Sequence, residues 1–80
     1  MTARVRLYSK PGCHLCDDAR AVIAQVCAEL GESFDEVDIT AGPEAAELTR
    51  AYGEEIPVTF VDGRQHDFWR VDADRLRAAL

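Results

Sequence analysis

A break in the hydrophobic pattern at residues 10–12 does most to constrain the fold of this chain. Before it, the stretch ARVRLYS alternates apolar and polar side chains, which predicts a strand. After it, apolar residues recur at steps of three and four, which predicts a helix from about residue 13 to residue 30. The residues of this stripe are Leu15, Ala19, Val22, Ile23, Val26, Cys27 and Leu30. Gly31 is expected to end the helix as a left-handed cap.

Residues 34–53 predict a second strand and a second helix. The apolar residues that mark the strand, with irregular alternation, are Phe34, Val37 and Ile39. After a turn, Pro43 is expected to be the first helical residue, because its fixed φ suits that position. Leu48 and Tyr52 lie four positions apart and are expected on the buried side of the helix, which Gly53 ends.

A β-hairpin follows, because an Asp-Gly pair separates two short runs rich in strand-forming residues. A two-residue turn would pair Phe60 with Gln65. A three-residue turn would pair Phe60 with His66 and Val58 with Phe68. We favour the second register, because it suits a half-buried face better.

The last element is a short helix that Asp72 can cap, so the predicted order is βαβαββα. The first strand–helix–strand unit implies a parallel pair with a right-handed crossover, whereas the hairpin strands must be antiparallel. The expected fold class is therefore α/β, with a four-stranded mixed sheet and three helices. A chain of 80 residues is expected to form a single domain, residues 1–80.

Charge excludes several kinds of partner. Nine basic residues against fifteen acidic ones give a formal net charge of −6, so neither nucleic acid nor an anionic membrane surface is expected as a partner. The start, MTARVRLYSK, does not resemble a secretory signal, and no stretch approaches the roughly 18 apolar residues of a membrane span. We therefore expect a cytoplasmic location, where a close cysteine pair indicates redox chemistry or metal binding.

Cys13 and Cys16 stand where the first strand gives way to the first helix. A cysteine at the helix start faces unpaired backbone N–H groups and the positive end of the helix dipole, which favour the thiolate. Cys16 lies one turn further on, within reach of that sulfur. We therefore expect Cys13 to be the exposed catalytic nucleophile and Cys16 the more buried resolving thiol, with His14 adding positive charge beside the thiolate.

Two other interpretations stay open. Cys13 and Cys16 could belong to a metal or iron–sulfur module, although a four-thiolate site would need further ligands from a second chain or from glutathione. Alternatively, the domain could serve protein interaction without catalysis. We assign no metal ligands. Cys27 is expected to be a buried core thiol, because it lies on the apolar stripe and about 21 Å along the helix from Cys13.

The stretch YSKPGCHLC resembles that of the glutaredoxins, in which a strand, a lysine and two residues precede a CxxC pair. The stretch EIPV, residues 55–58, is similar to the family segment in which a cis-proline opens the third strand. The likeness spans nearly the whole chain and is greatest to a short glutaredoxin-like branch in bacteria. It implies the thioredoxin fold in its short glutaredoxin form.

The same resemblance implies roles for three of the four expected substrate-binding residues, the fourth being His14. Ile56–Pro57 would be a cis peptide, with Pro57 packed against the cysteine pair and the Ile56 backbone hydrogen-bonded to an extended thiol substrate. Lys10 would face the carboxylate of glutathione or support the thiolate, with His14 beside it. The function implied is that of a monomeric dithiol thiol–disulfide oxidoreductase, which reduces disulfides of proteins or small molecules.

Three departures from the family pattern bear on glutathione. Leu15 replaces the aromatic residue usual inside CxxC, and Glu55 replaces a threonine. The stretch RQHDFWRVD lacks the GG-x-x-D motif that places helix amides on a glutathione carboxylate. Glutathione is an anion, and Glu54 and Glu55 would lie beside its site. The resemblance therefore implies glutathione as a co-substrate, whereas these residues disfavour its binding. No tightly bound cofactor is expected.

Overall fold

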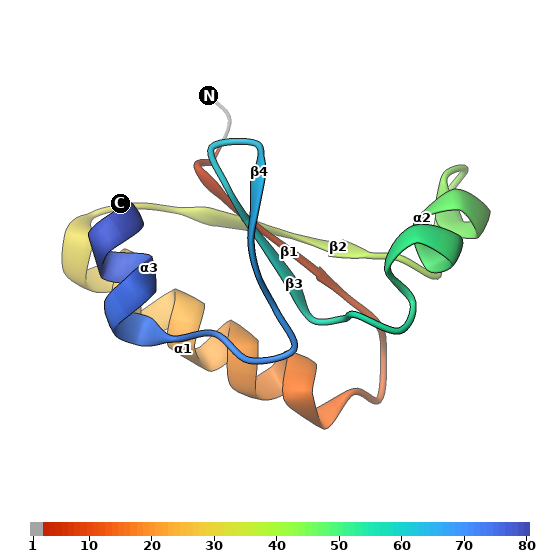
Figure 1. Ribbon diagram of the computed structural model, residues 1–80, viewed down its shortest axis with the longest axis horizontal. Coiled ribbons are helices and arrows are strands. Elements are labelled where there is room, and N and C mark those ends of the chain that lie inside the picture. Colours follow the sequence, from red (N-terminus) through yellow and green to blue (C-terminus); the bar gives the residue numbers. More distant parts are fainter. Residues whose placement is uncertain (1–2) are drawn as a thin grey trace.

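The computed structural model describes residues 3–80 and has the predicted order of elements (Figure 1). In chain order they are β1 (Val5–Ser9), α1 (His14–Leu30), β2 (Phe34–Asp38), α2 (Ala45–Tyr52), β3 (Val58–Val61), β4 (Arg64–Phe68) and α3 (Ala73–Ala79). The four strands form one mixed sheet in the order β2-β1-β3-β4. Within the described part of the chain, no helix is long and apolar enough to cross a membrane.

The sheet has one parallel pair and two antiparallel pairs, as predicted. β1 pairs with β2 in parallel, with Val5 opposite Phe34, and α1 makes the crossover between them. β1 and β3 are antiparallel, as are β3 and β4. β1 ends at the loop of residues 10–13, and β3 begins after the loop of residues 53–57. Because β1 and β3 are antiparallel neighbours, these two distant loops lie at the same end of the sheet.

The main core lies between the sheet and the helices α1 and α3, which pack together on one side of it (Figure 1). Alternate residues of β1 point into this core because successive side chains of a strand face opposite sides. The buried residues of the cluster are Val5, Leu7, Ala19, Ile23, Val26, Cys27, Val61 and Leu76. The cluster therefore fixes α1 against β1, and so positions the helix start where the cysteines lie.

A second, smaller cluster lies at the end of the sheet near α2. Its buried members are Cys16, Ile39, Ile56 and Val58. Three aromatic rings pack beside it, with the centroids of Tyr8 and Phe60 5.0 Å apart and those of Tyr8 and Tyr52 5.2 Å apart. Leu48 and Tyr52 of α2 are half-buried against this cluster, on the side of the helix that the sequence predicts.

The hairpin register combines the two that the sequence allows. Near the turn, Phe60 pairs with Gln65, as a two-residue loop requires. A β-bulge between Thr59 and Phe60 then shifts the register by one residue, so Val58 still pairs with Phe68. The predicted pairing of Phe60 with His66 is therefore wrong, whereas that of Val58 with Phe68 is confirmed.

Two further expectations are corrected. Pro43 lies in the turn before α2, which begins at Ala45 with Glu44 at its N-cap. Leu15 and Leu30 are 39% and 45% exposed, although they belong to the apolar stripe of α1. Both lie at the ends of a 17-residue helix, beyond the part that the sheet and α3 cover. The left-handed cap at Gly31, with φ of 68°, is confirmed.

Candidate active site

Cys13 is the N-cap of α1. Its backbone is extended, with φ of −103° and ψ of 109°, and its sulfur accepts a hydrogen bond from the backbone N–H of Cys16 at 3.2 Å. Gly12 precedes it with φ of 74°, a left-handed conformation that glycine adopts without a side-chain clash. The side chain of Cys13 is half-buried, so its sulfur reaches both the helix amides and the surface.

Cys16 lies beneath Cys13 and is fully buried. Burial raises the pKa of its thiol from 9.0 to about 11, and the hydrogen bond with the Cys13 side chain acts in the same direction. The backbone of Lys10 hydrogen-bonds the same thiol and acts in the opposite direction. At neutral pH Cys16 is therefore a protonated thiol held next to the more exposed sulfur.

Cys27 is also buried, at the far end of the α1 stripe, and burial raises the pKa of its thiol. It belongs to the main core cluster, whereas Cys13 and Cys16 belong to the smaller one. The predicted role of Cys27 as a core thiol is confirmed. Of the three free cysteines, only Cys13 and Cys16 lie together.

Lys10 and His14 are both exposed, on either side of the Cys13 cap. Lys10 lines a shallow hollow with polar side chains that include Arg20 and Glu36. The Arg20 guanidinium donates to both carboxylate oxygens of Glu36, at 2.6 and 2.5 Å, and holds the pKa of that carboxyl below its ordinary value. Lys10 is therefore the cation that this hollow can offer to a bound anion.

The Ile56–Pro57 peptide bond is cis, and both residues are buried. Ile56 packs in the cluster that contains Cys16 and Cys13, so the structure brings this loop to the cysteine pair. The Ile56 N–H donates to the Tyr52 carbonyl at 3.1 Å. An extended substrate could therefore meet only the carbonyl of Ile56. Direct packing of Pro57 on the two sulfurs stays a prediction.

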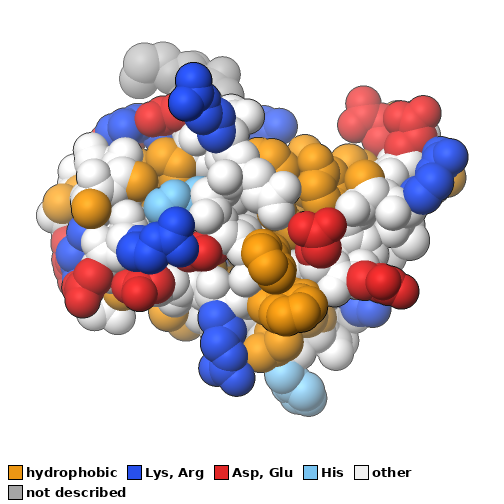
Figure 2. All heavy atoms as spheres, in the orientation of Figure 1, with side chains coloured by type: hydrophobic (Ala, Val, Ile, Leu, Met, Phe, Trp, Pro, Cys, Tyr) orange, Lys and Arg blue, Asp and Glu red, His pale blue; other side chains and the backbone are white. Residues whose placement is uncertain are grey.

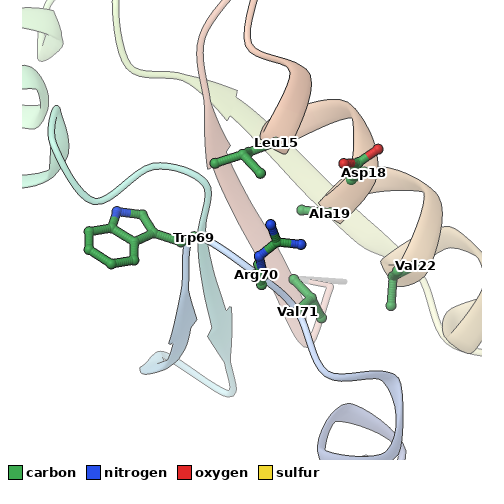
Figure 3. Close-up of a pocket in the computed structure, with 7 residues that line it drawn as sticks. All are labelled: Leu15, Asp18, Ala19, Val22, Trp69, Arg70 and Val71. Carbon is green, nitrogen blue, oxygen red and sulfur yellow. The ribbon is translucent and has the colours of Figure 1, made fainter.

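Trp69 is the feature of this site that the sequence did not indicate. It follows β4 with φ of 62°, and its N–H donates to the carbonyls of Pro57 at 2.7 Å and Glu55 at 3.2 Å. Trp69 and the two residues that follow it, Arg70 and Val71, form one wall of a pocket. Residues of α1 form the other wall (Figure 3). The lining residues are Leu15, Asp18, Ala19, Val22, Trp69, Arg70 and Val71. No local pattern in the sequence gives a reason to place Trp69 beside Leu15 of α1.

Residues 3–80 contain no group of three or more His, Cys, Asp or Glu side chains placed to hold a metal ion. A metal or iron–sulfur centre at Cys13 and Cys16 would therefore need ligands from outside this part of the chain. The arrangement that is present consists of a half-exposed sulfur at a helix N-terminus, a buried thiol one turn below it and a cis-proline loop in the same cluster.

A comparison with models of protein families identifies the family of this chain. The model described as "Glutaredoxin-like domain (DUF836)" matches residues 4–80. The chain belongs to this glutaredoxin-like family. The Mycobacterium tuberculosis protein Rv0508 is 37% identical over 81 residues, which cover 96% of this chain and 81% of that protein. The resemblance inferred from the CxxC and EIPV segments is therefore confirmed.

Solved structures agree with the family assignment and show the thioredoxin-like fold. The X. campestris protein XcR50 is 41% identical, with a TM-score of 0.74 and coverage of 92% of this chain and 91% of that one. Protein Ne2328 from Nitrosomonas europaea has a TM-score of 0.79 at 24% identity, over 100% and 93% of the two chains. Glutaredoxin C1 from Populus tremula x tremuloides has a TM-score of 0.58 at 22% identity, over 92% and 70%, a likeness of fold alone.

Proposed function

We propose that this glutaredoxin-like domain is a dithiol thiol–disulfide oxidoreductase, with Cys13 as nucleophile and Cys16 as resolving thiol. The observation that carries the proposal is the asymmetry of the pair. The sulfur of Cys13 is half-exposed and accepts a backbone N–H at a helix N-terminus, whereas Cys16 is buried and protonated beneath it. Helix N-termini stabilise anions, so the outer sulfur is the one activated for attack.

In the first step, the Cys13 thiolate attacks one sulfur of a substrate disulfide. The S–S bond of the substrate breaks, a mixed disulfide forms at Cys13, and the other substrate sulfur leaves as a thiolate that takes a proton from water. In the second step, Cys16 attacks the Cys13 sulfur, and its proton passes to the departing substrate sulfur. The second substrate thiol is released, and a Cys13–Cys16 disulfide remains, so two electrons have passed to the substrate.

Return to the dithiol form needs an external thiol reductant. Glutathione is one candidate, and Lys10 is the residue that would face its carboxylate. His14 would add positive charge near the leaving thiolate, while the Ile56 carbonyl and Pro57 would align an extended substrate. We infer further that the domain acts as a monomer in the cytoplasm, a reducing compartment that keeps such thiols ready for attack.

The test is disulfide reduction by single-cysteine variants. Pre-reduced protein, freed of excess reductant, is mixed with hydroxyethyl disulfide, and the mercaptoethanol released in a single turnover is measured after an acid quench. Cys13→Ser should lower the rate at least 100-fold, because Cys13 is the one cysteine of the three that is not buried. Cys27→Ala is the matched control, because Cys27 lies in the other cluster and should leave the rate within twofold. Wild-type rates from Cys13→Ser would refute the proposal.

A further inference from the structure

Three large hydrophobic side chains are exposed around the start of α1 and the end of β4. Trp69 is 51% exposed, Phe68 48% and Leu15 39%. Figure 2 shows hydrophobic side chains gathered over this part of the molecule, with acidic, basic and histidine side chains next to them. Leu15 lies between the two active-site cysteines in the chain, so the exposed surface adjoins the nucleophile. Exposed apolar surface of this kind marks a site of interaction.

The Trp69 side chain is held in place. Its indole Nε1–H donates to the Glu54 carbonyl at 2.9 Å, and its backbone N–H donates to the carbonyls of Pro57 and Glu55. Its φ of 62° is one that bulky residues rarely adopt. The ring also stacks edge-on against Phe68, with centroids 5.1 Å apart. The aromatic surface is therefore pre-organised and fastened to the loop that carries the cis-proline.

The pocket between Trp69 and Leu15 has the size of one side chain. Its volume is about 180 Å³. Sites that enclose whole drug-sized molecules occupy roughly 300–1,000 Å³. A tripeptide such as glutathione would overfill the pocket, whereas one bulky apolar side chain of a longer polypeptide would fit between α1 and the segment of residues 69–71 (Figure 3).

The charges around the pocket favour a cationic polypeptide. Asp18 and Arg70 line it, one charge of each sign, and Glu54 and Glu55 lie on the loop whose backbone carbonyls accept from Trp69. Lys10 and His14 are the exposed basic side chains next to Cys13. The whole chain has a formal net charge of −6. A substrate with basic residues near its disulfide complements this surface, whereas an anionic thiol does not.

We propose that Leu15, Phe68 and Trp69 form a docking surface for polypeptide substrates that carry a bulky apolar side chain and basic residues next to the disulfide. The inference rests on the proposed function and names its substrate class. Trp69 is then a specificity-determining residue. It selects the segment of the substrate that is presented to Cys13, and takes no part in sulfur exchange.

The test compares two cationic peptides, each with one cysteine joined by a disulfide to 5-thio-2-nitrobenzoate, whose release is followed by absorbance. They differ only in leucine or serine beside the cysteine. Reduced wild-type protein should react about tenfold faster with the leucine peptide, the discrimination that a small apolar pocket provides. Trp69→Ala and Leu15→Ala should bring the ratio to within twofold of one. Leu30→Ala removes an exposed leucine at the other end of α1 and should keep the wild-type ratio.

Each other result overturns the inference in a distinct way. Equal wild-type rates with both peptides would remove the docking surface but leave the oxidoreductase intact. No reaction with either peptide would remove the proposed function itself. If the wild-type protein reacted faster with oxidised glutathione than with the leucine peptide, and Trp69→Ala abolished that advantage, the pocket would be assigned to glutathione. A dimer in sedimentation analysis that Trp69→Ala dissociates would assign the surface to a second copy of the chain.

Discussion

At the residue scale, the three cysteines of this domain are separated by their surroundings. Cys13 lies at a helix N-terminus with its sulfur half-exposed, Cys16 is buried one turn below it, and Cys27 is buried in the main core. Burial disfavours the charged form of a thiol, so the two inner cysteines are held protonated. The proposed thiol–disulfide exchange therefore begins at Cys13.

The raised pKa of Cys16 makes stability depend on pH in the alkaline range. The folded-state pKa of about 11 lies above the ordinary value of 9.0, which the unfolded chain should have. The contribution of Cys16 is fully present below pH 9 and is lost as the pH rises through 11, because the unfolded chain then releases the proton more readily. The free energy of unfolding of the wild-type protein, measured by urea denaturation, should fall between pH 8 and pH 10.5. The same measurement on Cys16→Ala should show a smaller fall.

Both proteins share every other titrating group, so the difference between their pH profiles isolates Cys16. Parallel profiles for wild type and Cys16→Ala would mean that the thiol titrates alike in the folded and unfolded chain. The buried, protonated state assigned to the resolving thiol would then be wrong.

At the scale of elements, both helices that were predicted to have side-chain caps have them. Cys13 caps α1, and Asp72 caps α3 by accepting from the N–H groups of Asp74 at 2.9 Å and Arg75 at 3.1 Å. α3 is short, but its Leu76 is fully buried in the main core beside α1. The cap of α3 therefore stabilises a helix that packs against α1, whose N-terminus carries the candidate site.

Replacing Asp72 by alanine should lower the free energy of unfolding by about 1 kcal/mol, the usual value of such a cap. Asp72→Asn is the matched control, because its amide oxygen can still accept from the same N–H groups. Urea denaturation of the three proteins gives the comparison. An Asp72→Ala variant as stable as wild type, or an Asp72→Asn variant as unstable as Asp72→Ala, would contradict the capping role.

The order of elements could be predicted because each boundary has a local cause. The Pro11–Gly12 break, the cap at Gly31 and the Asp62–Gly63 turn each act within a few residues. The hairpin register could not be predicted, because a bulge in the middle of the hairpin changes the register. Phe60 pairs with Gln65 near the turn, and Val58 pairs with Phe68 at the far end. The start of α2 also differed, because Pro43 lies in the turn and leaves Glu44 as the cap.

Much of the candidate site follows from the CxxC spacing, because a three-residue step places Cys16 one turn below Cys13. The role of Trp69 does not follow from any local pattern. Its position depends on hydrogen bonds to carbonyls of residues 54, 55 and 57, twelve or more positions away in the chain. The exposure of Leu15 has a similar cause, since only the packed fold shows which part of the α1 stripe the core covers.

At the scale of the whole molecule, the fold brings the cysteine pair and the cis-proline loop to one end of the sheet within an acidic surface. The formal net charge is −6, and acidic residues Glu54 and Glu55 lie on the loop that accepts hydrogen bonds from Trp69. Long-range attraction raises the encounter rate of opposite charges and is screened by salt. Charge should therefore bias the choice of substrate before any contact is made.

Cystamine, a disulfide with two ammonium groups, should be reduced faster than dithiodiglycolate, which has two carboxylates. The advantage should be largest near 0.01 M salt, where the screening length is about 30 Å, and should shrink towards 1 M, where it is about 3 Å. Hydroxyethyl disulfide is the neutral control, and its rate should change little with salt. Faster reduction of the dicarboxylate at low salt would show that Lys10, and not the acidic surface, governs approach.

The central claim, that the outer sulfur attacks and the inner one resolves, is tested most directly by mass analysis of trapped intermediates. Cys16→Ser protein, treated with a peptide disulfide and digested, should carry the peptide on Cys13 in a stable one-to-one adduct, with Cys27 free. Wild-type protein treated in the same way should contain a Cys13–Cys16 disulfide and no adduct. An adduct on Cys27, or no adduct on Cys13 while the peptide disulfide is still consumed, would contradict this account.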